Sequence, residues 1–226
     1  MLSEEETDMK RFAPQGLLTF CLLAIGIGQA LAHSAEEHAG HDMPAQSAHS
    51  ESARIKLADV PLVDQSGKTV RLEKDLVTDK IVVMSFIYTS CTTVCPVVSS
   101  IMGKVQQQLG ARVGSEVQLV SISIDPQRDD AERLNDYARS FQKGPGWSWL
   151  TGSTQSVNET LKGLGSFSGD FKRHQPLILV GDGNSRHWTR FYGFTDPAVL
   201  SREVEKLSGE RNVHAKHTAI AMEQQP

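Results

Sequence analysis

An apolar run, Ile81–Tyr88, sets the strongest limit on the fold that this chain can adopt. It is rich in β-branched and aromatic residues, which is typical of a buried strand. Cys91 and Cys95 follow the run, and Pro96 comes directly after the second cysteine. Proline is well tolerated at the first position of a helix, because its missing N–H is not needed there. We therefore expect a strand, a short loop and a helix, with both sulfurs near the helix N-terminus.

The cysteine pair can support more than one chemistry. The positive end of a helix favours the thiolate over the thiol. If Cys91 and Cys95 were both helical, they would lie on one face with their Cβ atoms about 5–6 Å apart, which suits two ligands of one ion. Modest movement would also allow a disulfide. The residues alone leave three interpretations open: a redox-active pair, a site for a soft metal, or a structural pair of thiols or disulfide.

The first residues have the pattern of an export signal. Lys10 and Arg11 precede the apolar stretch Leu17–Gly28, and Gln29–Ala32 ends in a small-residue cleavage motif. The stretch falls short of the roughly 20 apolar residues that span a bilayer comfortably. We expect residues 1–32 to be a cleaved signal peptide and the mature protein to be periplasmic or otherwise extracytoplasmic. The alternative is an uncleaved leader that anchors the chain to the inner membrane.

Export affects the interpretation of the cysteines. Cys21 lies in the leader, so Cys91 and Cys95 are the only cysteines of the expected mature chain. An oxidising compartment normally drives a nearby pair to a disulfide. Binding a metal through thiolates in that compartment would therefore require a partner that acts as a thiol reductant.

Composition divides the chain into segments. The formal net charge of −4 gives no sign of a nucleic-acid surface. Residues 33–53 are small and polar and are expected to be disordered, as is a tail at 212–226, on either side of one domain at 54–211. The 33–53 segment is either a solvated linker or a metal-binding tract. It contains His33, His38, His41, His49 and Met43.

Apolar periodicity predicts an α/β domain. Val60–Leu72 reads as a β-hairpin around Gln65–Gly67. Strands are expected at Ile81–Tyr88, Val117–Ile124, Trp147–Leu150, Pro176–Val180 and His187–Phe194, and helices at Val97–Leu109, Asp129–Phe141, Thr154–Leu164 and Pro197–Leu207. Thr154 is expected to cap its helix. Strands that alternate with helices and end in a hairpin predict a central mixed sheet flanked by helices.

Polar residues gather at one expected edge of this sheet. Ligand sites in open α/β sheets lie at the carboxyl ends of the central strands. The cysteine pair follows the first central strand, and Asp125 and Asp129 follow the second. These carboxylates could bind a metal or tune a cysteine, or they could simply end a strand and start a helix. His174 precedes the strand Pro176–Val180, and it reaches the same edge if that strand runs antiparallel to the first two.

These motifs together resemble the Sco/SenC family of copper proteins. The resemblance covers roughly residues 55–207 and is carried by Cys91-Thr-Thr-Val-Cys95-Pro, by Asp125-Pro-Gln-Arg-Asp129 and by the downstream His174. It implies a thioredoxin-like fold, here with the Val60–Leu72 hairpin as an N-terminal extension. It also implies that Cys91, Cys95 and His174 bind one copper ion per chain, as Cu(I), Cu(II) or both.

The resemblance implies a metallochaperone more readily than a turnover enzyme. Its expected partner is a copper acceptor such as a subunit of cytochrome c oxidase, whose binuclear copper centre would be assembled close to a membrane. The copper donor and the thiol reductant are not identified by the sequence. Two thiolates and one imidazole suit copper and leave the ion open for transfer, whereas zinc would prefer a fourth ligand.

Two other functions use the same cysteines. The main alternative is a thiol-disulfide oxidoreductase acting on a copper-site protein, with Cys91 as the attacking sulfur and Cys95 as the resolving one. The three-residue spacer departs from the two-residue spacer that is usual in thioredoxin-type oxidoreductases. A peroxide-reducing enzyme of thioredoxin-like fold is the third possibility. His174 would be needed for metal binding and dispensable for simple disulfide exchange.

Overall fold

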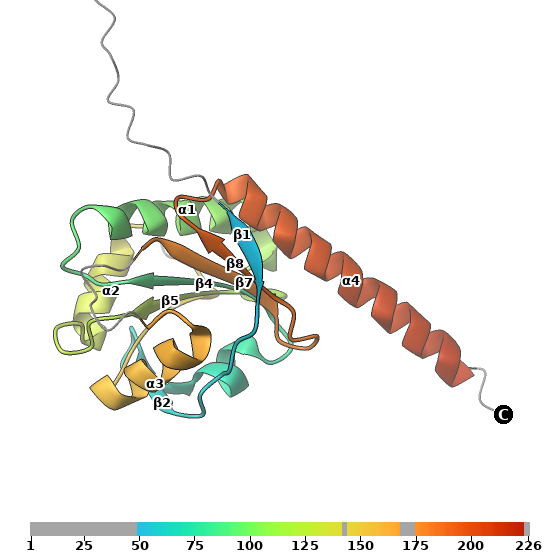
Figure 1. Ribbon diagram of the computed structural model, residues 1–226, viewed down its shortest axis with the longest axis horizontal. Coiled ribbons are helices and arrows are strands. Elements are labelled where there is room, and N and C mark those ends of the chain that lie inside the picture. Colours follow the sequence, from blue (N-terminus) through green and yellow to red (C-terminus); the bar gives the residue numbers. More distant parts are fainter. Residues whose placement is uncertain (1–48, 142–143, 168–174, 224–226) are drawn as a thin grey trace, which may run out of the picture. The chain divides into compact units, whose positions relative to one another are not determined.

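The computed structural model describes residues 49–141, 144–167 and 175–223 (Figure 1). Several residues and segments singled out above lie outside the described residues: the expected signal peptide 1–32, then His33, His38, His41 and Met43, and His174. The described residues all belong to one compact unit, Met43–Pro226. Within them, no helix is both long enough and apolar enough to cross a membrane.

The described residues form one mixed sheet with the strand order β1-β8-β7-β4-β5-β6-β2-β3. The strands are β1 (Ser50–Ala53), β2 (Pro61–Asp64), β3 (Thr69–Arg71), β4 (Ile81–Ile87), β5 (Val117–Ser123), β6 (Trp147–Thr151), β7 (Leu177–Asp182) and β8 (Trp188–Tyr192). β4 pairs in parallel with β5 and antiparallel with β7. The predicted hairpin is confirmed as β2 and β3, which extend the sheet beyond β6.

Helices cover both faces of the sheet. The α-helices are α1 (Val94–Leu109), α2 (Ala131–Arg139), α3 (Thr154–Leu164) and α4 (Pro197–Glu223), with a short π-helix η1 (Leu72–Val77) and a short 3₁₀-helix η2 (Gly110–Arg112). Successive side chains of a strand point to opposite faces. Ile81, Val83 and Ile87 of β4 therefore join the core under α1, α2 and α4. Val82, Met84 and Phe86 join the second core under α3 and η1.

The residues that cap two helices differ from those expected at the helix starts, because the capping residue must itself have non-helical backbone. Ser153, not Thr154, caps α3: its backbone is extended, and its Oγ accepts from the Ser156 N–H at 3.0 Å. Asp130, not Asp129, caps α2 and accepts from the Arg133 N–H at 2.8 Å. Asp129 is thereby free for a different role, described below.

The expected disorder of residues 33–53 is wrong at its end, because Ser50–Ala53 forms the edge strand β1. β1 pairs antiparallel with β8, from Ser50 opposite Phe191 to Ala53 opposite Trp188. The His49 ring also stacks on Tyr192, with the ring centroids 4.5 Å apart. Backbone pairing and one aromatic contact hold a sequence too polar to signal a strand.

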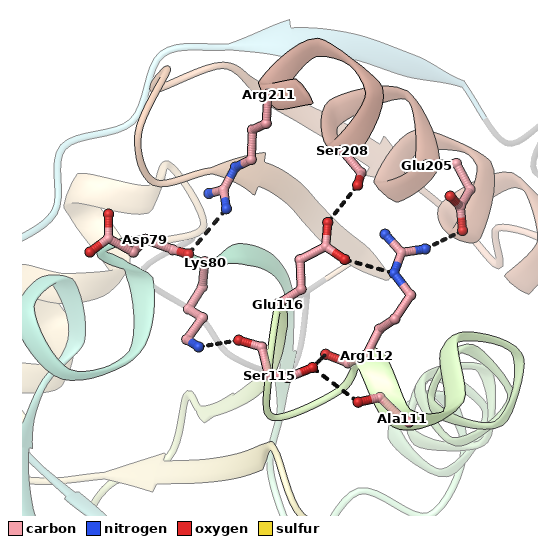
Figure 2. Close-up of polar contacts among 9 residues, drawn as sticks. All are labelled: Asp79, Lys80, Ala111, Arg112, Ser115, Glu116, Glu205, Ser208 and Arg211. Atoms are coloured by element: carbon pink, nitrogen blue, oxygen red, sulfur yellow. Dashed lines mark hydrogen bonds and ion pairs between the residues drawn. The ribbon is translucent and has the colours of Figure 1, made fainter. Parts of the chain in front are cut away.

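The expected disordered tail at 212–226 is also wrong up to Glu223, because α4 continues through it (Figure 1). Helix-favouring alanine and lysine and the absence of proline allow this continuation. Polar contacts secure the middle of α4 to the domain (Figure 2). Arg112 pairs with Glu205, Glu116 accepts from the Ser208 hydroxyl at 2.5 Å, and Arg211 Nη1 donates to the Asp79 carbonyl at 3.0 Å.

Candidate metal centre

Cys91 and Cys95 lie where the central strand β4 gives way to helix α1. Tyr88 leaves β4, and its carbonyl accepts from the Cys91 N–H at 3.2 Å, which turns the chain towards the helix. Both cysteines are free thiols. Their exposed fractions are only 7% for Cys91 and 3% for Cys95. The prediction that the pair sits at the N-terminus of a helix is confirmed.

The sulfur of Cys91 takes the place of a helix cap. Thr93 stands at the N-cap position of α1, but its side chain makes no capping hydrogen bond. Instead, Cys91 Sγ accepts from the Cys95 N–H at 3.3 Å. Pro96 is the third residue of α1 rather than the first, still within the turn whose N–H groups lack helical partners. Backbone N–H donors and the positive end of α1 are therefore both directed at the Cys91 sulfur.

These contacts and burial give the two thiols different pKa values. Burial acts to raise the pKa of Cys91, but hydrogen bonds from Cys95 and from the Tyr88 hydroxyl outweigh it and lower the pKa to about 7. Burial raises the pKa of Cys95 above its ordinary value, and the hydrogen bond that it gives to Cys91 adds to the effect. At pH 7 Cys91 is therefore about half ionised, and the negative charge of the pair is centred on its sulfur.

Tyr88 is a member of the site that the sequence did not single out. Burial and its hydrogen bond to Cys91 raise the pKa of the Tyr88 phenol to about 12. The hydroxyl therefore stays protonated and acts as a donor to the Cys91 sulfur. One sequence signal could have identified Tyr88 as part of the site: it comes directly after a buried strand and three residues before the first cysteine.

Asp129 fastens the cysteine loop to the neighbouring strand. Its carboxylate is almost fully buried and accepts from the Thr89 N–H at 3.0 Å, the Thr89 hydroxyl at 2.5 Å and the Ser123 hydroxyl at 2.6 Å. Asp125 is engaged by Arg128 at 2.9 Å. Both carboxylates thus have structural roles. The Asp129 charge also contributes to the raised pKa of Cys95, so this carboxylate tunes a cysteine as well.

Aromatic rings pack beside the helical side of the site. Ser99 lies one turn beyond Cys95 on α1, and its hydroxyl is 3.4 Å from the Tyr137 hydroxyl. Tyr137 packs edge-on against Trp149 with ring centroids 5.6 Å apart. Trp149 in turn stacks on Trp147 at 4.8 Å. Low local polarity on this side accounts for the strong burial effect on Cys95.

The third predicted ligand, His174, lies outside the described residues. The strand that follows it does run antiparallel to β4, as the shared edge requires: Ile178 of β7 faces Ser85. Pro176, just before β7, accepts at its carbonyl from the Gly193 N–H at 2.9 Å. The chain therefore enters β7 at the edge where β4 ends. In the described part of the chain, no three His, Cys, Asp or Glu side chains are grouped to hold a metal ion.

The donors that are described fit copper. Copper(I) prefers soft thiolate ligands, and Cys91 supplies a thiolate near neutral pH while Cys95 lies beside it. Both cysteines are buried in the hydrophobic core, and the low dielectric of a protein interior strengthens the interaction of a cation with a thiolate. A third donor arriving from the segment before β7 would leave the ion three-coordinate and open to exchange.

Solved structures share this architecture. The structure of Bradyrhizobium japonicum ScoI with copper bound aligns with a TM-score of 0.55 at 25% identity, covering 65% of this chain and 95% of that one. BsSco, described as a member of the Sco family of cytochrome c oxidase assembly proteins, aligns with a TM-score of 0.59 at 23% identity, covering 70% and 96%. The predicted thioredoxin-like fold is thereby confirmed.

Sequence comparison agrees with the structural one. The SCO1 protein homolog of Bacillus subtilis (strain 168) is 31% identical over 130 residues. The aligned region is 57% of this chain and 63% of that relative, so less than two thirds of the relative is covered. The SCO1/SenC family model matches residues 49–209, which include the whole strand-loop-helix unit that carries Cys91 and Cys95. The chain belongs to the SCO1/SenC family.

Proposed function

We propose that this protein is a copper metallochaperone that holds one ion at Cys91, Cys95 and His174 and passes it to an extracytoplasmic acceptor. The observation that carries the proposal is the unequal sulfur pair, in which the Cys91 sulfur accepts a hydrogen bond from the Cys95 N–H and the Cys91 thiol has a pKa of about 7. The copper-bound ScoI structure, with the same fold, supports copper as the cargo.

The residues of this chain divide the work of binding. Cys91 presents a thiolate to the arriving ion, because its negative charge is already stabilised by backbone N–H groups and by the Tyr88 hydroxyl. Cys95 holds its proton until the ion arrives and then releases it as the second ligand. Asp129 fixes the loop that carries Cys91, so the two sulfurs keep their relative placement during exchange.

The acceptor that we propose is a subunit of cytochrome c oxidase during assembly of its binuclear copper centre. The family resemblance and the description of BsSco as a cytochrome c oxidase assembly protein support this choice. We also propose that the chain works in the periplasm after cleavage near Ala32. N-terminal sequencing of the protein recovered from its own cell should then begin at His33, and a start within residues 1–31 would favour an anchored leader.

The direct test is copper affinity in single variants. His174→Ala, Cys91→Ser and Cys95→Ser should each lower Cu(I) affinity at least tenfold in competition with a chelator, and each should lower cytochrome c oxidase activity in the host cell. His217→Ala is a matched control, because His217 is an exposed histidine on α4. Full copper affinity in His174→Ala would contradict the assignment of the third ligand.

Thiol-disulfide exchange is the second candidate, and the unequal thiols favour it specifically. A low-pKa attacking sulfur beside a high-pKa resolving sulfur is the arrangement that such exchange uses. Under this alternative, His174→Ala would keep full cellular activity while Cys95→Ser would lose it. Loss of activity in both variants supports the metallochaperone.

A further inference from the structure

The strand β1 attaches the histidine-rich N-terminal segment to the sheet at the edge where the cysteines lie. β1 pairs antiparallel with β8, so it begins where β8 ends, with Ser50 opposite Phe191. The end of β8 lies beside the start of β7, because Tyr192 is opposite Leu177. β7 starts at the edge where β4 ends and the cysteine loop begins. The chain therefore enters the domain on the side of the sheet that carries the sulfur pair.

His49 is fixed at this entry point. Its carbonyl accepts from the Tyr192 N–H at 3.0 Å, and its ring stacks on the Tyr192 ring. The Tyr192 hydroxyl in turn donates to the Glu51 carboxylate at 2.8 Å, and Arg190 pairs with the same carboxylate at 3.3 Å. Backbone pairing, ring stacking and an ion pair thus hold β1 in place, although three of its four residues are exposed.

The entry point is close enough to the cysteines for the preceding segment to reach them. β1 and β4 are separated in the sheet by β8 and β7 (Figure 1). Three interstrand spacings of about 4.8 Å place these two strands roughly 14 Å apart. A chain spans at most about 3.5 Å per residue, so the stretch from His41 to His49 can cover up to about 28 Å. Donors at His41 and before it can therefore reach Cys91.

The segment before β1 carries side chains that suit copper. Imidazole nitrogen and thioether sulfur both bind Cu(I). Four such donors, which precede the described part of the chain, occur between residues 33 and 43: His33, His38, His41 and Met43. All four are neutral ligands, whereas Cys91 supplies a thiolate near neutral pH. A thiolate is both soft and negatively charged, so exchange of Cu(I) from these donors to the cysteine pair is favourable.

We propose that His33–Met43 is a copper-collecting arm, which binds Cu(I) and passes it within the same chain to Cys91 and Cys95. This role rests on the proposed copper function and adds to it a second binding site. The transfer is a ligand exchange without a change of oxidation state. Bonds from copper to imidazole and thioether break as bonds to the two sulfurs form, and the thiol protons go to water. Anchoring by β1 keeps the arm at a high effective concentration around the cysteines.

The test measures how fast Cu(I) moves, without oxygen, from its coloured bicinchoninate complex to the cysteine pair of the full chain. A variant with His33→Ala, His38→Ala, His41→Ala and Met43→Leu should load at least tenfold more slowly than the wild-type chain. Its final Cu(I) affinity at the cysteine pair should be unchanged, because the arm supplies none of the final ligands.

The matched control removes three other histidines. His187→Ala, His214→Ala and His217→Ala together take away as many exposed imidazoles as the arm variant does. His187 leads into β8 at the edge opposite the cysteines, and the other two lie on the last turns of α4. This control should load at the wild-type rate.

A longer tether tests whether the transfer occurs within one chain. Inserting about 24 Gly and Ser residues between Gln46 and Ser47 lengthens the connection from His41 to His49 roughly fourfold and leaves every donor in place. Effective concentration falls roughly as the −3/2 power of tether length, so loading should slow by about eightfold.

The outcomes separate a failure of the arm from a failure of the copper centre. Wild-type loading rates in the arm variant would overturn the inference and leave the proposed function standing. Slow loading in the arm variant with a normal rate in the insertion variant would overturn transfer within the chain. In a chain with Cys91→Ser and Cys95→Ser, one weaker Cu(I) ion should remain and should be lost when the arm donors are also replaced. Full Cu(I) affinity in that chain would overturn the arm and the copper centre together.

Discussion

At the scale of single residues, the two cysteines should differ in reactivity by a measurable pH dependence. The pKa of Cys91 is lowered from an ordinary 9.0 to about 7, so its thiolate accumulates as the pH rises through 7. The rate of alkylation by iodoacetamide in the metal-free protein should follow a midpoint near pH 7. In Cys91→Ser the remaining Cys95, with its raised pKa, should react slowly up to pH 9. A midpoint near 9 in the unmodified protein would contradict the hydrogen-bond account.

Tyr88→Phe tests the phenol contact by itself. The variant keeps the ring but removes a donor to the Cys91 sulfur, so the pKa of Cys91 should rise. A hydrogen bond to a charged group contributes about 1.5 kcal/mol, which corresponds to roughly one pKa unit. The alkylation midpoint should therefore move to about pH 8. Tyr137→Phe, which removes the hydroxyl near Ser99 instead, should leave the midpoint in place.

The sequence predicted the cysteine pair and its helix because those features are local. A strand-like run, two sulfurs and a proline occur within 16 residues, and neighbouring chemistry suffices to interpret them. The role of Tyr88, and the part that Asp129 plays in holding the cysteine loop, were not predicted because these depend on contacts made by folding. Asp129 reaches Thr89 across 40 positions of sequence, and only the parallel pairing of β4 with β5 brings them together.

At the scale of elements, the buried ion pair between α4 and β7 should contribute measurably to the attachment of the helix. Asp182 is almost fully buried and Arg211 is mostly buried. Arg211→Ala would leave a buried carboxylate without its cation, which costs about 3 kcal/mol of unfolding free energy. Arg71→Ala breaks the exposed pair with Asp59 and should cost less than about 1 kcal/mol. Urea unfolding of both variants measures the difference.

The same pair predicts the pH dependence of stability. Burial acts to raise the pKa of Asp182, but hydrogen bonds from Arg211 and from the Asn184 N–H outweigh it and hold the pKa below the ordinary 3.8. A depressed carboxyl pKa stabilises the fold above the unfolded-state pKa, and this contribution is lost as the pH falls. The difference in unfolding free energy between the wild-type protein and Arg211→Ala should thus reach its largest value at pH 6 and should decrease below pH 4. A gap that stays constant to pH 3 would assign the loss to packing.

Element identities followed from periodicity, whereas element ends and edges did not. β4 and β5 were predicted because apolar residues, many of them β-branched, make up most of both runs. β1 was missed because Ser50–Ala53 carries no apolar alternation, and its pairing depends on the exposed backbone of β8. The continuation of α4 past Leu207 was missed because the apolar stripe ends there, while helix propensity and the polar contacts of Ser208 and Arg211 carry the chain on.

The two halves of α4 should therefore differ in stability. Leu200, Val204 and Leu207 are buried in the core, whereas Val213 and Ile220 are exposed. A helical segment of about a dozen residues without packing is marginal in water. Amide hydrogen exchange in the metal-free protein should be near the unprotected rate from Val213 to Ile220 and strongly slowed from Leu200 to Leu207. Equal protection in both halves would mean that a second contact covers the end of the helix.

At the scale of the whole molecule, copper binding should be linked to proton release, because every sulfur ligand must be deprotonated. Cys95 is protonated throughout the neutral range, whereas Cys91 is about half ionised at pH 7. Binding of Cu(I) should release about 1.5 protons from the sulfurs at pH 7 and about one at pH 8.5. Calorimetry in buffers of different ionisation enthalpy counts these protons.

The direction in which the number of released protons changes with pH tests both sulfur ligands in one experiment. Release that falls towards one as the pH rises requires that both sulfurs bind the ion and that Cys91 alone ionises near pH 7. In Cys95→Ser, whatever affinity remains should release less than one proton at pH 7 and almost none at pH 8.5. A count that stays at two up to pH 8.5 would mean that Cys91 is an ordinary thiol. The proposal that the Cys91 thiolate, stabilised at the helix N-terminus, is the first ligand of copper would then be wrong.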